Sequence, residues 1–161
     1  MLKISKIAAV AGLLVAVSGV TVGAEAQATK TLYLSENGNL ERGMQSLRQG
    51  NLKQAARHLR RAVRADLGAE RLAPALSNLC AVEYVLGELD AAEKHCSQAI
   101  GEDRHFWRAY VNRGNVHKAK GSYDAAHADY RRAADISSND LTAQALASLE
   151  ADHDRLVAEA K

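Results

Sequence analysis

The sequence predicts an all-α protein built as a solenoid of antiparallel helix pairs. A turn motif recurs at a near-constant interval along most of the chain, which is the pattern of stacked repeat units. The chain is rich in alanine and has a single proline, a composition that favours closely packed helices over a sheet. Since each pair of helices buries its apolar face only against its neighbours, the units are expected to form one continuous array.

The amino-terminal 26 residues have the layout of a secretory signal peptide. Two lysines precede an uncharged, mainly apolar stretch over residues 7–24, and small residues follow it. We expect cleavage before Gln27, with cleavage before Thr29 as the alternative, and a flexible segment over residues 27–35. The mature protein is then periplasmic or secreted. An uncleaved membrane anchor is the other interpretation, because about 18 apolar residues is the lower limit for spanning a bilayer.

The mature chain is nearly neutral. Removal of the signal peptide takes away two of the 21 basic and one of the 19 acidic side chains, which leaves 19 against 18. This balance argues against a nucleic-acid partner, which requires a basic surface. The remaining length suits one domain.

An internal repeat marks three units. Gly87–Ala92 matches Gly121–Ala126 at an offset of 34 residues, and Gly50–Ala55 repeats the same turn 37 residues before Gly87. The offset of 34 also pairs other positions: Ala75 with Ala109, Asn78 with Asn112, Val82 with Val116, and Ala99 with Ala133. The three units span residues 36–69, 73–106 and 107–140.

These units resemble the tetratricopeptide repeat, a 34-residue pair of antiparallel helices with small residues at three packing positions. In the third unit the small positions hold Gly114, Ala126 and Ala133, and the large aromatic positions hold Tyr110, Tyr123 and Tyr130. The small positions of the first two units hold Gly43, Ala55 and Ala62, and Cys80, Ala92 and Ala99. The resemblance implies a right-handed superhelix whose first helices line a concave, peptide-binding groove.

Several positions depart from the family pattern. Arg42 and Arg113 stand where the family usually has an apolar residue. Ser46, Glu83 and His117 replace a frequent aromatic residue one turn later. We therefore expect unusual packing on the groove side of the first helices.

Residues 141–161 predict one further helix that caps the array. Four apolar residues are expected on one face of it: Leu141, Ala145, Leu149 and Leu156. A terminal helix of a solenoid needs one apolar face and one wet face, and this segment has both. Asp140 is the predicted N-cap.

The resemblance implies ten groove residues, running from apolar in the first unit to cationic in the third: Leu40, Met44, Leu47, Ser77, Ala81, Tyr84, Arg108, Val111, Asn115 and Lys118. Such a groove suits a protein segment with an apolar end and an acidic end. The alternative is that residues 29–36 cover the apolar end. Leu40 and Met44 stand at lysine and asparagine positions of the family's carboxylate clamp, so the resemblance disfavours a chaperone-tail partner.

A second candidate surface lies on the second helix of the first unit. Five cations recur there at spacings that place them on roughly one helical face: Lys53, Arg57, Arg60, Arg61 and Arg64. The simplest interpretation is a solvated outer face. The functional interpretation is a contact for an acidic protein surface or for anionic lipid headgroups.

The two cysteines predict a disulfide. Cys80 and Cys96 lie at similar distances on either side of the turn at Gly87, so antiparallel helices bring them opposite each other. In an oxidising compartment we expect a structural disulfide that closes a loop of roughly 15 residues. Two reduced core cysteines are the alternative, and a redox-active pair is disfavoured because the spacing is not Cys-x-x-Cys.

The sequence predicts no cofactor, no metal site and no catalytic site. His117 and His127, with Asp124 nearby, are too few ligands for a zinc site. His58 and His95 are expected to be exposed on the second helices. The acidic residues are expected on solvent faces: Glu88, Asp90, Asp124 and Asp129. No nucleophile stands beside a base, so an enzyme is an unfavoured alternative.

Two functions follow from these observations. The first is an exported adaptor or scaffold that holds a segment of a cell-envelope protein in the groove. The second is a structural protein that assembles with itself, or at a membrane surface, through the basic outer face.

Overall fold

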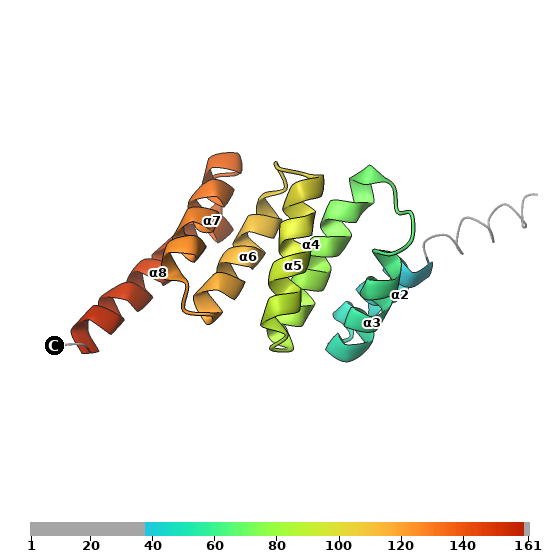
Figure 1. The fold of residues 1–161 in the computed structure, drawn as a ribbon, viewed down its shortest axis with the longest axis horizontal. Coiled ribbons are helices and arrows are strands. Elements are labelled where there is room, and N and C mark those ends of the chain that lie inside the picture. The colour runs from blue at the N-terminus through green and yellow to red at the C-terminus, as the bar shows by residue number, and fades with distance from the viewer. Residues whose placement is uncertain (1–37, 160–161) are drawn as a thin grey trace, which may run out of the picture. The chain divides into compact units, whose positions relative to one another are not determined.

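The computed structural model describes the backbone of residues 38–159, with side chains through Asp152, and this part of the chain is entirely helical (Figure 1). Seven helices follow one another in it: α2 (Gly38–Arg48), α3 (Leu52–Ala62), α4 (Ala69–Val85), α5 (Leu89–Glu102), α6 (Trp107–Ala119), α7 (Tyr123–Ile136) and α8 (Asp140–Glu159). None of these helices is both long and apolar enough to cross a membrane. The predicted signal peptide and the predicted flexible segment lie outside the described residues.

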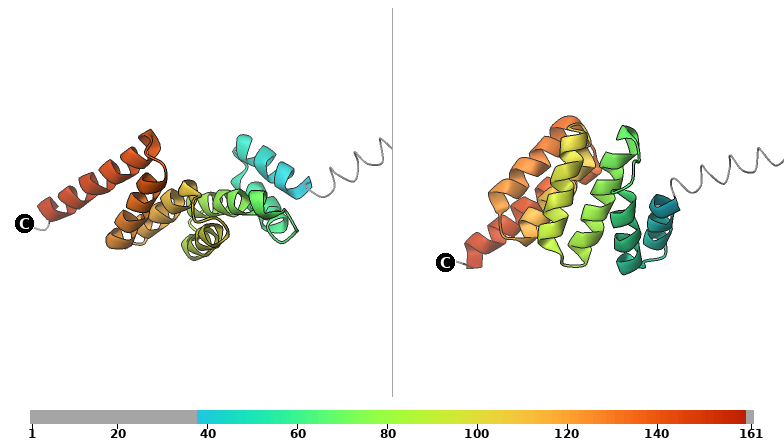
Figure 2. Two further views of the ribbon diagram at one scale, coloured as in Figure 1. Left: turned by 90° about the horizontal axis from the view of Figure 1, so that it is seen from above. Right: turned by 45° about the vertical axis from the view of Figure 1, so that its right-hand side comes forward.

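The helices form successive antiparallel pairs, α2 with α3, α4 with α5, and α6 with α7, and α8 follows the last pair. The predicted all-α solenoid with a carboxyl-terminal helix is therefore confirmed. Within this unit α2, α4, α6 and α8 run along one side and α3, α5 and α7 along the other (Figure 2). We call these the inner side and the outer side.

A glycine ends the first helix of every pair. Gly50, Gly87 and Gly121 have φ angles of 72°, 79° and 75°, in the left-handed region that glycine occupies without strain. At the middle turn the N–H of Gly87 donates to the carbonyl of Tyr84, and the N–H of Glu88 donates to that of Glu83. These two bonds close the helix carboxyl terminus, so the repeated glycine marks the point where each pair reverses.

Small residues let the two helices of each pair approach closely. A Cβ on Gly114 would stand 2.6 Å from Cδ1 of Tyr130, and one on Gly43 would stand 2.9 Å from Cγ of Leu59. Six alanines at the other small positions are buried: Ala55, Ala62, Ala92, Ala99, Ala126 and Ala133. Ala62 packs with Ala75 and Ala99 with Ala109, each in the following unit, so the small residues serve close packing both within the pairs and between them.

The connection between the first and second helix pairs is longer than the connection between the second and third. Residues 63–68 join α3 to α4, whereas residues 103–106 join α5 to α6. Gly68 precedes α4 with a φ of 71°, and its N–H donates to Oδ1 of Asp66 at 3.0 Å. The second unit also has the longer first helix, since α4 has 17 residues and α6 has 13.

The start of α8 differs from the prediction. The cap is Asn139, whose Oδ1 accepts from the backbone N–H of Leu141 at 3.0 Å and of Thr142 at 3.2 Å. Asp140 is therefore not the N-cap, because the side chain one position earlier already satisfies these donors.

The apolar face of α8 also begins later than predicted. Leu141 is 58% exposed, and Thr142 is buried in its place, with its hydroxyl donating to the Ser137 carbonyl at 3.0 Å. Leu149 is buried in a cluster with Tyr130, and Ala145 packs beside it. The side chain of Leu156 lies outside the described residues.

Candidate protein-interaction surfaces

The inner side begins with an apolar patch on α2. Leu40, Met44 and Leu47 are each half-buried, and the two leucines pack against the core formed by α3 and α4. Sδ of Met44 lies 3.3 Å from Nδ2 of Asn78 in α4. Leu40 and Leu47 therefore contribute to the core, and all three predicted groove residues of the first unit remain partly exposed.

The second unit contributes two of its three predicted groove residues. Ala81 and Tyr84 are half-buried, and Tyr84 packs against the cluster that contains Cys80 and Cys96. Ser77 is 2% exposed, and its hydroxyl accepts a hydrogen bond from Nδ2 of Asn112 at 3.0 Å. The prediction that Ser77 lines an open groove is wrong, because this hydrogen bond holds it between α4 and α6.

The third unit begins with an exposed cation and a half-buried apolar residue. Arg108 is exposed and lies over the ring of Trp107, 4.3 Å from its centroid, and Val111 is half-buried. Asn115 accepts a hydrogen bond from the Tyr130 hydroxyl at 2.7 Å. Burial of that hydroxyl raises the pKa of Tyr130 to about 12, so it stays protonated and donating at neutral pH.

The cationic end of the predicted groove is partly covered by α8. Nζ of Lys118 lies 2.8 Å from the carboxylate of Asp152 and 2.9 Å from the hydroxyl of Ser148. Lys118 is thus paired within the chain, and Arg108 remains as the exposed cation among the predicted groove residues.

One of the five cations of the predicted basic face does not lie with the others. Lys53, Arg57, Arg61 and Arg64 are exposed, as a solvated face requires. Arg60 instead turns to α4, where its Nε lies 3.0 Å from Oε1 of Glu83, and its guanidinium also pairs with Glu88. Helical spacing placed Arg60 with the other cations, but the acidic partners on the next unit draw it away.

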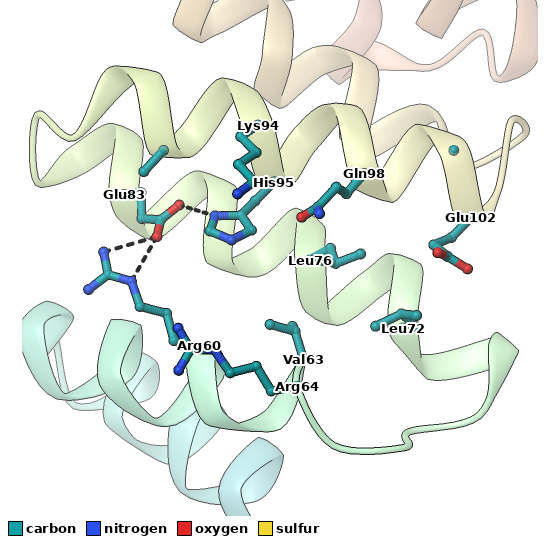
Figure 3. A pocket seen from close by; sticks show the side chains of 12 residues that line it. Arg60, Val63, Arg64, Leu72, Leu76, Glu83, Lys94, His95, Gln98 and Glu102 are labelled. Atoms are coloured by element: carbon teal, nitrogen blue, oxygen red, sulfur yellow. Dashed lines mark hydrogen bonds and ion pairs between the residues drawn. The ribbon is translucent and has the colours of Figure 1, made fainter.

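Glu83 is a buried carboxylate between α3 and α5 (Figure 3). It is fully buried, with Oε1 held by Arg60 and Oε2 lying 2.6 Å from Nδ1 of His95. The sequence placed Glu83 at a position that is usually aromatic, and that departure was the signal of a polar site. The prediction that His95 is exposed is wrong, since it is drawn in by Glu83 and its side chain is only 19% exposed.

The same two positions are polar in all three units. The offsets of 37 and 34 place Ser46 and His58 in unit one at the sites of Glu83 and His95, and His117 and Asp129 in unit three. In unit three, Nε2 of His117 lies 3.6 Å from the Asp129 carboxylate. In unit one the Ser46 hydroxyl donates to the Arg42 carbonyl, and the buried Nδ1 of His58 has no partner among the described residues.

Asp129 forms a two-point ion pair. Its oxygens lie 2.9 Å from Nε and 2.7 Å from Nη2 of Arg113. The hydrogen bonds that Arg113 donates to the Asp129 carboxylate raise the pKa of Arg113. The predictions that Asp129 and His58 are solvent-exposed are therefore wrong, because the first pairs with Arg113 and the second is half-buried.

Residues 108–140, which comprise nearly all of α6 and α7, match the family model described as a tetratricopeptide repeat. Residues 108–140 therefore form a tetratricopeptide repeat. No curated protein matches its sequence.

Solved tetratricopeptide-repeat domains share the fold. That of Sgt2 from Aspergillus fumigatus aligns with a TM-score of 0.69 at 16% identity, over 79% of this chain and 84% of that one. The second such domain of human RPAP3, in complex with the HSP70 peptide SGPTIEEVD, gives 0.65 at 19% identity, over 73% and 97%. The TPR2B domain in a complex of yeast Sti1 with pHsp70 gives 0.66 at 18% identity, over 74% and 98%. At these identities the likeness establishes the fold.

The middle helix pair contains a disulfide between Cys80 in α4 and Cys96 in α5, with the two Cα atoms 5.4 Å apart. Both residues are fully buried, and they pack with Ala92 and with Val116 of the next repeat. Cys80 occupies the small packing position that glycine holds in the other two units, at Gly43 and Gly114.

The described part of the tetratricopeptide-repeat array contains no group of three potential metal ligands. His127 and Asp124 are exposed at the turn into α7, whereas His117 is half-buried and lies beside Asp129. The cross-turn histidines are therefore in different surroundings.

Proposed function

We propose that this chain is a protein-interaction module that holds a segment of a partner protein along its inner side. One observation carries the proposal, namely a series of half-buried apolar and aromatic residues on successive first helices: Leu40, Met44, Leu47, Ala81, Tyr84 and Val111. Exposed apolar surface of this kind on a rigid helical array is what an amphipathic partner segment needs.

The structural neighbours support a peptide ligand, since the RPAP3 domain is in complex with a peptide and the Sti1 domain with pHsp70. The ligand of this chain is expected to differ from the tail of HSP70. Leu40 and Met44 present apolar surface where the family's clamp carries lysine and asparagine, and Lys118 is paired with Asp152. We propose a partner segment that is mainly apolar, with an acidic residue placed near Arg108.

We further propose that the chain is exported and that its partner belongs to the cell envelope. The signal-peptide layout of residues 1–26 supports export. The disulfide supports it independently, because disulfides persist in oxidising compartments. Mass spectrometry of the protein isolated from the envelope tests this point, with an amino terminus at Gln27 expected and an intact Met1 contradicting it.

The proposed binding side is tested by site-specific photocrosslinking in the native cell. A photoreactive residue at position 84 samples the inner side, and one at position 61, an exposed arginine of α3, is the matched control on the outer side. We expect one recurrent partner protein from position 84 and not from position 61. Tyr84→Ala should abolish its capture by a probe at position 111 without loss of helicity.

The second candidate function, self-assembly through the outer basic face, gives a different result. Crosslinks from position 61 to another copy of the chain, lost on reversing Arg57 and Arg61 and weakened by salt, would favour it. In the same assay the peptide SGPTIEEVD should not compete with the inner-side partner, and competition would restore the chaperone-tail interpretation.

A further inference from the structure

A pocket on the outer side is separate from the inner side and from the exposed cations Lys53, Arg57 and Arg61. It has a volume of about 890 Å³ and lies between α3 and α5, with α4 beneath it (Figure 3). This volume is within the usual range for ligand sites. The pocket lies at the junction where residues 63–68 form the longer connection between units.

The pocket has an apolar part and a charged part. Val63, Leu72 and Leu76 form the apolar part beside the start of α4. The charged part is formed by side chains from α3, from the connection that follows it, and from α4 and α5: Arg60, Arg64, Glu83, Lys94 and His95. Gln98 and Glu102 stand along the α5 edge. A ligand lying across the pocket therefore meets both kinds of surface.

Some of the charged groups in the pocket form ion pairs and others do not. Both oxygens of the Glu83 carboxylate are already held, by Arg60 and by His95. Among the described residues, Arg64 and Lys94 form no ion pair, although both line the pocket. The exposed Glu102 stands at the opposite end, where Leu72 also lies (Figure 3). The unmatched charge at the end formed by Arg64 and Lys94 is thus positive.

We propose that this pocket is a second protein-binding site, which takes a segment of a partner protein carrying an acidic side chain next to an apolar one. The acidic side chain lies between Arg64 and Lys94, and the apolar side chain contacts Leu72 and Leu76. Charge complementarity selects an acidic segment over a basic one. The site goes beyond the proposed function, because it uses the second helices rather than the first.

The test begins with a library of random dodecapeptides displayed on phage and selected on the purified protein. The library is first depleted on the Gln98→Trp variant, whose indole fills the pocket from an exposed position of α5. Peptides that bind the inner side also bind this variant and are removed. A negative result for the pocket is therefore independent of whether the inner side binds a partner. We expect the surviving peptides to pair aspartate or glutamate with a neighbouring large apolar residue.

A fluorescein-labelled copy of the most enriched peptide is then titrated by fluorescence anisotropy. The double variant Arg64→Glu and Lys94→Glu should weaken binding by about tenfold or more. The matched control, Lys53→Glu and Arg57→Glu, makes the same change of charge on exposed α3 positions outside the pocket and should stay within about twofold. Circular dichroism confirms that every variant keeps its helices.

Several outcomes overturn the proposal. Enrichment of no peptide, or of peptides without acidic residues, shows that the pocket does not select this chemistry. Equal weakening by the two double variants shows that only overall charge matters. Displacement of the peptide by free glutamate at similar concentration shows a small-anion site, and a dimer of the protein that the pocket variants dissociate shows a self-association surface.

Discussion

Glu83 is the clearest case in which the chemistry of one residue depends on its neighbours. Its carboxylate is fully buried, and burial of an unpaired charge costs several kcal/mol. Arg60 from the preceding unit and His95 from the partner helix offset that cost by hydrogen bonding to separate oxygens. Removal of one partner is therefore expected to lower the free energy of unfolding more than removal of the whole polar group.

Arg60→Met should lower the free energy of unfolding by about 1–3 kcal/mol, because the Glu83 carboxylate loses a hydrogen-bonded partner. Arg57→Met, at an exposed position of the same helix, is the control and should change it by less than about 0.5 kcal/mol. The double variant Arg60→Met with Glu83→Leu should regain most of the loss, since no buried charge remains. Urea denaturation measures the free energy of unfolding of all three variants. Equal effects of Arg60→Met and Arg57→Met would contradict the conclusion that Arg60 stabilises the buried carboxylate.

Gly114 permits the close approach of α6 and α7. Gly114→Ala should destabilise the protein by about 1–3 kcal/mol, because the new methyl group meets the Tyr130 ring. Gly101→Ala is the control, since a Cβ there meets no atom within 4 Å and α5 is already helical at that point. It should be neutral or stabilise by up to about 1 kcal/mol. Thermal unfolding followed by circular dichroism distinguishes these opposite signs.

At the scale of helices, the Cys80–Cys96 disulfide joins α4 to α5 across a sequence separation of 16. In the chain-entropy model a loop of this length contributes about 3 kcal/mol. Replacement of both cysteines by alanine should therefore lower the free energy of unfolding by about that amount. Reductant should destabilise the natural chain and leave the double variant unchanged, and a natural chain indifferent to reductant would show that the cysteines are not oxidised.

The helices were largely predictable from sequence, because each pair carries a local signal. Glycine at the reversal points and alanine at the contact positions are conformational and volume requirements that act within one unit. The groove residues and the charge partners were less predictable. Periodicity assigns a residue to a helical face, but Arg60, Ser77 and Lys118 are oriented by side chains 23, 35 and 34 residues away. Such partners depend on how units stack.

At the scale of the whole array, an ion pair joins each unit to the next. Arg60 reaches Glu83 from unit one to unit two, and Lys118 reaches Asp152 from unit three to α8. Between units two and three, Nζ of Lys120 lies 2.8 Å from Asp90 and 2.7 Å from Glu93. Each contact lies between neighbours, as expected for a quasi-one-dimensional array.

The link made by Lys120 should weaken in acid. Its hydrogen bonds hold the pKa values of the Asp90 and Glu93 carboxyls below their usual range. The stability they add is therefore present above the unfolded-state pKa values and is lost as pH falls through the lowered ones. Carboxyl titration by NMR should show both pKa values rising towards normal in Lys120→Met. Unchanged pKa values in that variant would show that Lys120 does not hold these groups.

The disulfide lies in the middle pair of helices, and this position determines which parts of the molecule unfold locally and are proteolysed first. Among the helices of residues 38–159, the first pair and α8 each pack against a neighbouring helix pair on one side only, so we expect them to open more readily than α4 and α5. A protease acting on the native protein should trim it from both ends and leave a resistant fragment that contains Cys80 and Cys96. The same digestion after reduction should leave no such fragment. How long a trimmed molecule persists should therefore depend on whether its surroundings keep the disulfide oxidised.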